Sequence, residues 1–377
     1  MMNYDGFQAG LPQYLLPWGV FVNRALAEDN NLDVPDPDWD LEEFTDFVSQ
    51  ADMENFFGVD GAPLSFIETG TTTIRARLAN YEEGDYVDLD SDEVKDLVDY
   101  IPEWAEHAIW PNWDAGNIPQ EVMDENWWWG YKFFIAGKLL ALPGDPWMMG
   151  DAAHPDPAHW GAVQSSDWDI YPRPATPYQP ATVGVVLDPM VVYNYAMDDG
   201  DPEMSDEELE KAQLAYTFMS FWVGDSRSWK ARADQMFTDG ETTKTAMNDS
   251  FPFVSDPETF EEQMGYWFST ETHQRYADAD RMPGFHKVLE LWQAGQIWDI
   301  SDKSFPWFHD FEGARRVNLY EWSQIGNAEI TGAGWLDPNL ADVIKSRLPD
   351  WDRTANENFR KSAAELEAGL EEFYSTN

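Results

Sequence analysis

The run GLPQYLLPWGVFVN, residues 10–23, is the stretch that decides the fold. It is an apolar, extended run that two prolines, Pro12 and Pro17, interrupt. Within a sheet, proline is confined to strand starts, edges and bulges because it has no N–H to donate. The run therefore predicts a buried strand that enters one lobe of an α/β protein.

The sequence on both sides of this run carries signals for further elements. Asp40 followed by Glu43 is a capping box in front of apolar residues at helical spacing, and Ser205 with Glu208 is a second one, which begins a helix predicted to reach Gly224. Helices are also predicted at 91–101 and 359–373, and a buried strand at 181–187. Helices and buried strands therefore share the chain, which indicates an α/β fold.

Length and composition indicate a folded protein of two lobes. The 377 residues are too many for one ordinary core. Hydrophobic residues make up 43% of the chain and aromatic residues 15%, including 20 Trp, which is far more apolar material than a disordered acidic chain carries. No internal repeat with a period of 20 to 50 residues is visible, so we expect two globular lobes and not a repeat array.

The chain is strongly acidic along its whole length. It has 71 acidic and 23 basic residues, which give a formal charge of −48. At molar salt the Debye length falls to about 3 Å, so neighbouring carboxylates barely repel one another and the hydrated acidic surface keeps the protein in solution. We therefore expect a salt-loving source organism. The same charge argues against nucleic acid as a partner and disfavours anionic ligands.

Cysteine, metal-site and export signals are missing from the sequence. Without Cys the chain has no disulfide, no thiolate metal site and no cysteine nucleophile. His154 and His159 are five residues apart, which is not the helical spacing of a zinc site, so we predict no metal and no cofactor. The first residues resemble no signal peptide, no lipidation Cys is present, and no run of about 18 apolar residues exists. The sequence as given shows no export address.

Several short motifs follow one another in an order typical of a known family. They are Tyr4-Asp5-Gly6, Leu11-Pro12, Trp18-Gly19, Trp39-Asp40-x-x-Glu43-Phe44, Phe134-x-x-Gly137-Lys138, Gly144-Asp145-Pro146-Trp147, Asp169 to Pro174, and Thr182-Val183-Gly184. In this order and spacing the chain resembles the extracellular solute-binding proteins of ABC transporters, the sugar-binding family that includes maltose-binding protein. One departure is Val185, where that family usually has a second Gly.

The resemblance implies a two-lobed periplasmic-binding-protein-like fold of type II. Residues 1–187 would form mainly the second lobe, entered from the hinge. Residues 188–255 would return to the first lobe, and 256–377 would complete the second lobe with C-terminal helices. Because members of the family have a first α/β unit before the Tyr4-Asp5-Gly6 motif, we expect the first lobe to be incomplete at its N-terminus.

The resemblance also implies a function. It predicts a monomer, extracellular and anchored to the membrane in the full-length family member, that captures a sugar or oligosaccharide between its lobes and delivers it to the membrane permease subunits of an ABC importer. No covalent bond of the ligand changes, so the protein is predicted not to be an enzyme.

Candidate ligand-binding residues are aromatic platforms and polar groups beside them, because sugars have apolar faces and polar rims. Trp147 ranks first, since it follows a turn at a strand end and the matching family residue stacks on sugar; the alternative is a core Trp. Trp18 and Tyr14 lie on the segment that crosses between lobes, where they either line the cleft or wedge the hinge. The full set is Trp147, Trp18, Tyr14, Asp145, Trp110, Trp113, Trp129, Trp307, Glu321 and Trp322.

Two other functions fit parts of the same sequence. A glycoside hydrolase also uses Trp platforms and needs only two carboxylates about 5 to 9.5 Å apart, which a chain this acidic offers by chance. A structural surface-layer protein would show many short strands at regular spacing together with repeats, and the sequence shows neither. The ordered family motifs favour the binding protein over both.

Overall fold

The structure is a computed structural model, and it describes residues 3–4, 7–8, 11–73, 88–126, 129–144, 148, 167–192, 205–234, 236–239, 242–245, 251–252, 254–270, 273–299 and 332–376.

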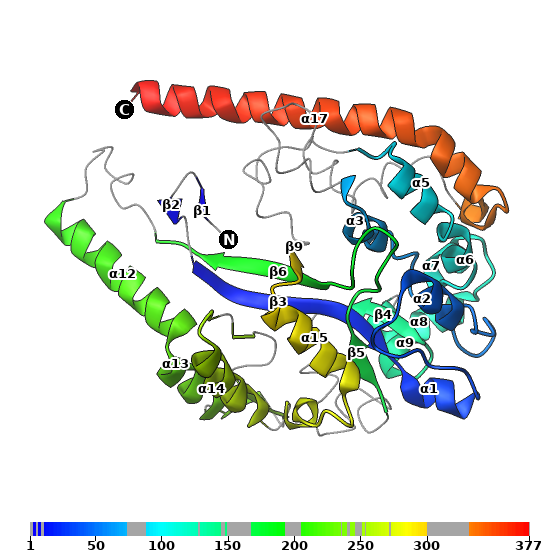
Figure 1. The fold of residues 1–377 in the computed structure, drawn as a ribbon, viewed down its shortest axis with the longest axis horizontal. Coiled ribbons are helices and arrows are strands. Elements are labelled where there is room, and N and C mark those ends of the chain that lie inside the picture. Colours follow the sequence, from blue (N-terminus) through cyan, green and yellow to red (C-terminus); the bar gives the residue numbers. More distant parts are fainter. Residues whose placement is uncertain are drawn as a thin grey trace.

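A long antiparallel ribbon runs through the middle of the molecule (Figure 1). Strand β3 (Leu11–Val22) pairs with β6 (Val183–Met190), from Leu11 opposite Met190 to Trp18 opposite Gly184. Farther along, β3 pairs with β4 (Ala141–Gly144) and with β5 (Asp169–Tyr171), both antiparallel. Strand β9 (Ile297–Asp299) lies parallel to β6. The strands predicted at 10–23 and 181–187 are therefore confirmed.

Among the described residues, the two prolines of β3 lie in the part of the strand that pairs with β6 on one side only. Both precede Gly19, the first β3 residue that pairs with β4. Between Pro12 and Tyr14 the register with β6 shifts, so the first proline coincides with an irregularity in the ladder. Edges and bulges are the places where a strand tolerates proline.

One group of helices surrounds the far end of β3, and we call it the α1–α9 lobe (Figure 1). Its helices are α1 (Arg24–Asp29), α2 (Leu41–Val48), α3 (Ser65–Gly70), α5 (Asp92–Val98), α6 (Ile101–Glu106), α7 (Ile109–Asp114), α8 (Gln120–Glu125) and α9 (Gly130–Ile135). The capping box predicted at Asp40 and Glu43 begins α2. The helix predicted at 91–101 is divided in two, because Pro102 stands in the first turn of α6, where proline is tolerated.

A second group of helices lies at the start of β3 (Figure 1). Helix α12 (Asp206–Gly224) begins at the predicted capping box of Ser205 and Glu208, and α13 (Ser226–Asp234) and α14 (Pro257–Phe268) follow it. Helix α15 (Pro283–Gln293), preceded by the short helix η4 (Gln274–Ala277), packs against β5 and β6. Two small hairpins, β1 (Asn3–Tyr4) with β2 (Phe7–Gln8) and β7 (Met236–Asp239) with β8 (Thr242–Thr245), complete the described strands.

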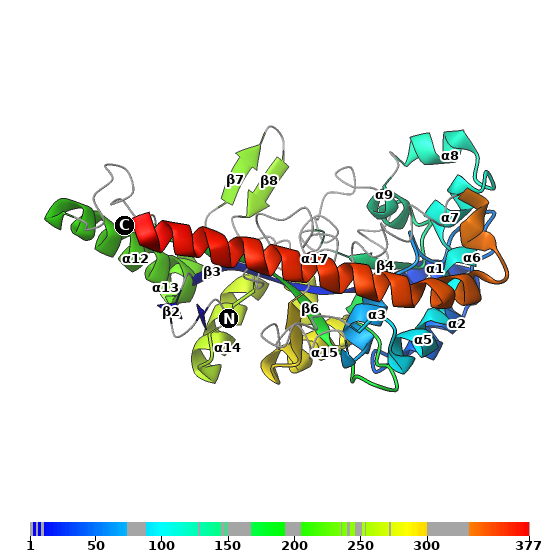
Figure 2. The same cartoon turned by 90° about the horizontal axis from the view of Figure 1, so that it is seen from above.

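The last helix crosses the whole molecule (Figure 2). A short helix η6 (Gly332–Leu336) leads into α17 (Leu340–Thr376), which packs its first turns against α5 and α6 and then runs back toward the end where α12 lies. Pro349 stands inside it, and Figure 1 shows the helix bending in this orange part, as expected where proline removes a hydrogen bond. The helix predicted at 359–373 is confirmed, but α17 begins earlier, at Leu340.

The core lies on both faces of β3. Val20 and Val22 belong to one cluster of buried side chains, which contains α2, α5, α6 and the first turns of α17. Phe21, between them, belongs to the other, which contains α9 and residues of α13, α14 and α15. This is the alternation of a strand buried on both faces. Within the described ranges, no helix has both the length and the apolar character needed to cross a membrane.

Candidate functional site

Three segments of the α1–α9 lobe run parallel and end at the same edge. Phe57 bridges to Leu139 and Val59 to Ala108, both in parallel orientation. Backbone bonds hold them: the Gly58 amide donates to His107 O at 3.0 Å, and the Ala141 amide donates to Gly58 O at 2.9 Å. The carboxyl ends of parallel strands are where α/β proteins bind ligands.

The direction of strand β3 shows which way this edge faces. It starts beside α12 and ends inside the α1–α9 lobe, and β4 runs opposite to it, with Gly144 paired to Gly19. The carboxyl ends of β4 and of the segments parallel to it therefore point back toward the second group of helices. We call the end of these strands, with Asp60, Trp110, Trp113, Trp129 and Trp18, the carboxyl edge.

Asp60 lies at the end of the segment 56–60. Its Oδ1 accepts the Gly61 amide at 2.9 Å, and its backbone carbonyl accepts the Trp110 amide at 3.0 Å. The side chain rests on Gly130: a Cβ built there would lie 2.5 Å from Asp60 Cβ and 2.6 Å from Oδ2. Burial raises the pKa of Asp60 to about 6, although its own amide and that of Gly61 act in the opposite direction.

Trp110 and Trp113 lie on α7, directly after the outer parallel segment, in which Ala108 bridges to Val59. Their rings meet edge to face, with centroids 6.4 Å apart, and both are half-buried against the second core cluster. Asn112 between them is buried, and its amide group donates to the carbonyls of Ala105, Glu106 and Ala108. These hydrogen bonds therefore fix the backbone of the turn that carries Trp110 and Trp113.

Trp129 stands just before α9 and is the most exposed of the candidate tryptophans that the structure describes. Its side chain is 36% exposed, and its ring lies 5.0 Å from that of the buried Tyr131. It directly precedes Gly130, on which Asp60 rests. An exposed indole beside a partly buried carboxylate offers a ligand an apolar face together with a hydrogen-bond acceptor.

Trp18 reaches the same edge from β3. It is half-buried, and the guanidinium of the buried Arg173 lies 5.9 Å from its ring centroid. Arg173 also donates to Ser65 O and Thr69 Oγ1. The backbone of Tyr14 pairs with Asp188 of β6, away from this edge.

The structure thus brings the segments that carry Trp110, Trp113 and Trp129 next to Asp60, with Trp18 on the same edge farther along the sheet. The other predicted residues, Trp147, Asp145, Trp307, Glu321 and Trp322, lie outside the described residues. Their predicted roles remain predictions, as does the division of the chain at residues 187 and 255.

Sequence reasoning missed Asp60 and Gly130. The available signal is Phe56-Phe57-Gly58-Val59 followed by Asp60-Gly61, a short apolar run that ends in a turn pair. Gly58 also fits such a central segment, since a side chain there would collide with the carbonyl of Val48.

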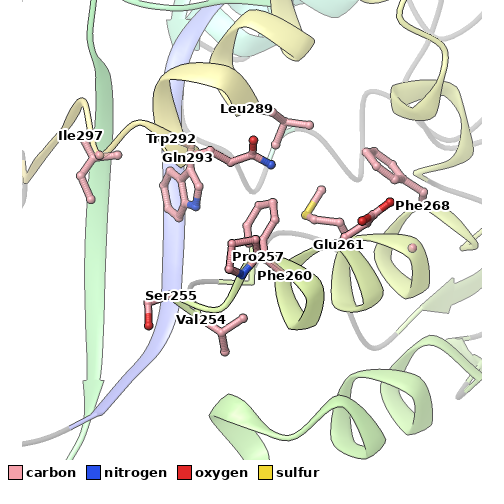
Figure 3. Close-up of a pocket in the computed structure, with 13 residues that line it drawn as sticks. Val254, Ser255, Pro257, Phe260, Glu261, Phe268, Leu289, Trp292, Gln293 and Ile297 are labelled. Atoms are coloured by element: carbon pink, nitrogen blue, oxygen red, sulfur yellow. The ribbon is translucent and has the colours of Figure 1, made fainter.

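A hollow lies away from the carboxyl edge, between α14 and α15 (Figure 3). It has a volume of about 1070 Å³, and Phe260, Met264, Leu289 and Trp292 form much of its lining. Glu261 and Gln293 supply polar groups among these apolar side chains. The described candidates Trp18, Trp110, Trp113 and Trp129 take no part in its lining, so it is distinct from the carboxyl edge.

The described side chains form no cluster of three or more His, Asp or Glu that is placed to hold a metal ion.

No protein-family model and no curated protein matches this chain. Among solved structures, it is similar to an ABC substrate-binding protein from Listeria monocytogenes in complex with cycloalternan, with 15% identity and a TM-score of 0.53 over 92% of this chain and 74% of that one. It is also similar to a cyclic alpha-maltosyl-1,6-maltose binding protein from Arthrobacter globiformis, with 13% identity and a TM-score of 0.54 over 96% of this chain and 74% of that one.

These identities are low, so the likeness shows the fold. It is the two-lobed fold of periplasmic binding proteins, which confirms the predicted fold class.

Proposed function

We propose that this protein is the substrate-binding component of an ABC importer that captures a sugar or oligosaccharide. The observation that carries the proposal is the carboxyl edge, where Asp60 packs on Gly130, next in the chain to the exposed Trp129, and its backbone carbonyl accepts the amide of Trp110, whose ring contacts that of Trp113. The similar solved structures support it, since one is an ABC substrate-binding protein in complex with cycloalternan and the other is a cyclic alpha-maltosyl-1,6-maltose binding protein.

The mechanism follows from the fold and the edge. A sugar ring stacks on the exposed indole of Trp129 or on the pair on α7, and its hydroxyl groups donate to Asp60. The second group of helices then closes over the ligand by a hinge motion along β3 and β6. Trp147 is part of this proposal, because β4 ends at Gly144 on the same edge.

The proposal includes partners, location and the absence of catalysis. The closed form would present the surface that the permease subunits recognise, outside the cell and at the membrane. The protein acts as a monomer. Binding changes the relative position of its two lobes and leaves the covalent structure of the sugar unchanged. A glycoside hydrolase remains the alternative.

Binding to a panel of neutral and amino oligosaccharides, followed by calorimetry, tests the proposal. Replacing Trp129 by Ala removes a stacking surface and should cost on the order of 1 to 3 kcal/mol, about a tenfold to hundredfold loss of affinity. The matched control is Tyr216→Ala, which removes an exposed aromatic side chain on α12 and should leave affinity unchanged.

Two outcomes would contradict the proposal. Equal affinities of the Trp129→Ala variant and the parent protein would remove Trp129 from the site. Consumption of the bound sugar, followed as release of reducing ends, would show a hydrolase instead.

A further inference from the structure

The hollow between α14 and α15 is kept open because each helix packs on other elements (Figure 3). Helix α14 packs against α13 and η4, whereas α15 packs against β5 and β6. The two helices are joined through Phe251, whose ring centroid lies 5.0 Å from that of Trp267 on α14 and 5.8 Å from that of Trp292 on α15. A volume of about 1070 Å³ remains between them. A preformed hollow of this kind is typical of a small-molecule site.

The hollow has an apolar floor and a polar rim. Its buried lining residues are all apolar, and each exposes less than a tenth of its surface; they are Phe260, Met264, Leu289 and Trp292. By contrast, Glu261 of α14 and Gln293 of α15 line the hollow from exposed positions. A ligand therefore meets apolar side chains in depth and hydrogen-bonding groups at the opening, as ligands do in most binding pockets.

Gly265 lies on the same rim, one helical turn after Glu261. A glycine inside a helix lowers stability relative to alanine, because it loses more conformational freedom on folding. The backbone of Gly265 is helical and its φ is not positive, so its conformation does not require glycine. A Cβ built there would have no described neighbour within 4 Å. Packing of the described residues therefore gives no reason for a glycine, whereas a ligand that lies across the rim does.

The charge at the rim favours a cation. Among the described residues that line the hollow, Glu261 is the only charged one. The net charge of −48 on the whole chain also favours a positive ligand over a neutral or a negative one. An amine that reaches Glu261 makes a charge-assisted hydrogen bond, which is stronger than the bond from a neutral hydroxyl group. The floor and the rim are thus complementary to an apolar molecule that carries one amino group.

We propose that the hollow between α14 and α15 binds an apolar amine, a molecule with an alkyl or ring body and one protonated amino group. The apolar body lies on Phe260 and Met264, passes over Gly265, and places its ammonium group at Glu261. This site is separate from the carboxyl edge, so it goes beyond the proposed sugar binding and does not depend on it.

A series of decyl compounds that differ only in their polar group tests the ligand class. The probes are n-decylammonium, n-decanol and decanoate, each below the concentration at which it aggregates, and ethylammonium, which has the charge without the chain. With the parent protein, calorimetry should show a single molecule of decylammonium per chain, bound about tenfold more tightly than decanol. Decanoate and ethylammonium should bind more weakly than decanol.

Variants of two rim residues locate the ligand. Glu261→Gln keeps the size of the side chain and should lower the preference for decylammonium over decanol to about one. Gly265→Leu places a side chain over the rim and should weaken binding of both compounds about tenfold or more. Gly265→Ala adds one carbon and should bind nearly as tightly as the parent protein. Both replacements of glycine favour the helix, so the melting temperature should stay the same or rise.

The control is Glu121→Gln on the exposed surface of α8, which removes the same charge away from the hollow and should keep the preference. A parent protein that binds none of the decyl compounds overturns the inference. Equal affinities for decylammonium and decanol overturn the role of Glu261 and the amine class. If Gly265→Leu binds as tightly as Gly265→Ala, the compounds bind outside the hollow and the site is wrong.

Discussion

At the residue scale, the burial of Asp60 at the proposed site has a cost in stability. Its pKa is raised by burial to about 6 in the folded protein, above the value of about 3.9 for an unfolded Asp. The folded state therefore takes up the proton more readily than the unfolded state. The carboxyl group destabilises the fold most above pH 6, and this penalty disappears as the pH falls toward 4.

Asp60→Asn should remove this penalty. We expect the variant to be more stable than the parent protein by about 1 to 3 kcal/mol at pH 7.5, with the difference shrinking toward zero near pH 4. Denaturant unfolding of both proteins across this range measures it. The control Glu121→Gln should show no such pH-dependent difference. A variant that is equally or less stable at pH 7.5 would show that the carboxylate is well solvated.

Residue types alone predicted the aromatic half of the proposed site and not its acid. Trp110, Trp113 and Trp129 were predicted because 20 Trp in a sugar-binding resemblance make aromatic platforms the natural candidates. Asp60 is one of 71 acidic residues, and only the parallel pairing of 56–60 with 107–110 and 138–141 distinguishes it. That pairing joins segments about 50 and 80 residues away along the chain, so local sequence does not reveal it.

At the element scale, Asp169 of β5 fastens the start of α15. Its Oδ2 accepts the Gly284 amide at 2.7 Å and Arg24 Nη1 at 3.2 Å, while Oδ1 accepts the Ile170 amide at 2.7 Å and the Phe285 amide at 3.1 Å. The N-cap residue Met282 makes no side-chain cap of its own. A carboxylate from a distant strand thus satisfies the first amides of this helix.

Asp169→Asn should destabilise the protein by about 2 to 4 kcal/mol. Burial raises the pKa of Asp169 to about 6, so removing the charge is itself favourable above that pH. The loss of hydrogen bonds outweighs this gain in stability, because the new NH₂ group would face buried N–H donors and leave them without an acceptor. Denaturant unfolding at pH 7.5 gives the total loss, and hydrogen exchange at the first turn of α15 locates it.

Asp256→Asn is the matched control for Asp169→Asn. Asp256 caps α14 by accepting the Thr259 amide at 2.9 Å, at an exposed position. Asn caps helices about as well as Asp, so this variant should cost no more than about 0.5 kcal/mol. Similar losses in the two variants would mean that the network around Asp169 adds nothing beyond an ordinary cap.

The elements that sequence predicted best are those with local signals. Both capping boxes, at Asp40 and Ser205, begin helices as expected. Helix α17 was predicted only in its later part, because the earlier residues Leu340, Ile344, Leu348 and Trp351 surround Pro349, which usually ends a helix. Packing of these residues against α5 and α6 overrides that local signal.

At the scale of the whole molecule, β3 connects fold and proposed function. The same strand pairs with β6 over its first part and with β4 and β5 over its last, so it passes from the second group of helices into the α1–α9 lobe. Periodicity alone predicts a buried strand at 10–23, and that this segment crosses between the two lobes is implied by the family motifs and stays a prediction. The carboxyl edge faces the second group of helices because of the direction of its strands. That direction is known only from the strand pairing.

The net charge of −48 leads to the last prediction, which concerns salt. Ion pairs such as Lys211–Glu207 and Lys230–Asp234 are mostly exposed, and 23 basic residues leave most of the 71 acidic ones to repel one another. At 0.1 M salt the Debye length is about 10 Å, so this repulsion acts between many side chains, whereas at molar salt the Debye length is about 3 Å.

We propose that the protein is adapted to high salt, and its melting temperature should fall by about 5 °C or more as KCl is lowered from about 2 M to 0.1 M. Calorimetry over this series measures the change, and a parallel series in sorbitol of matched osmolality separates charge screening from a general solvent effect. A melting temperature that stays constant in KCl, or that follows sorbitol equally, would show that repulsion among the carboxylates does not limit this fold.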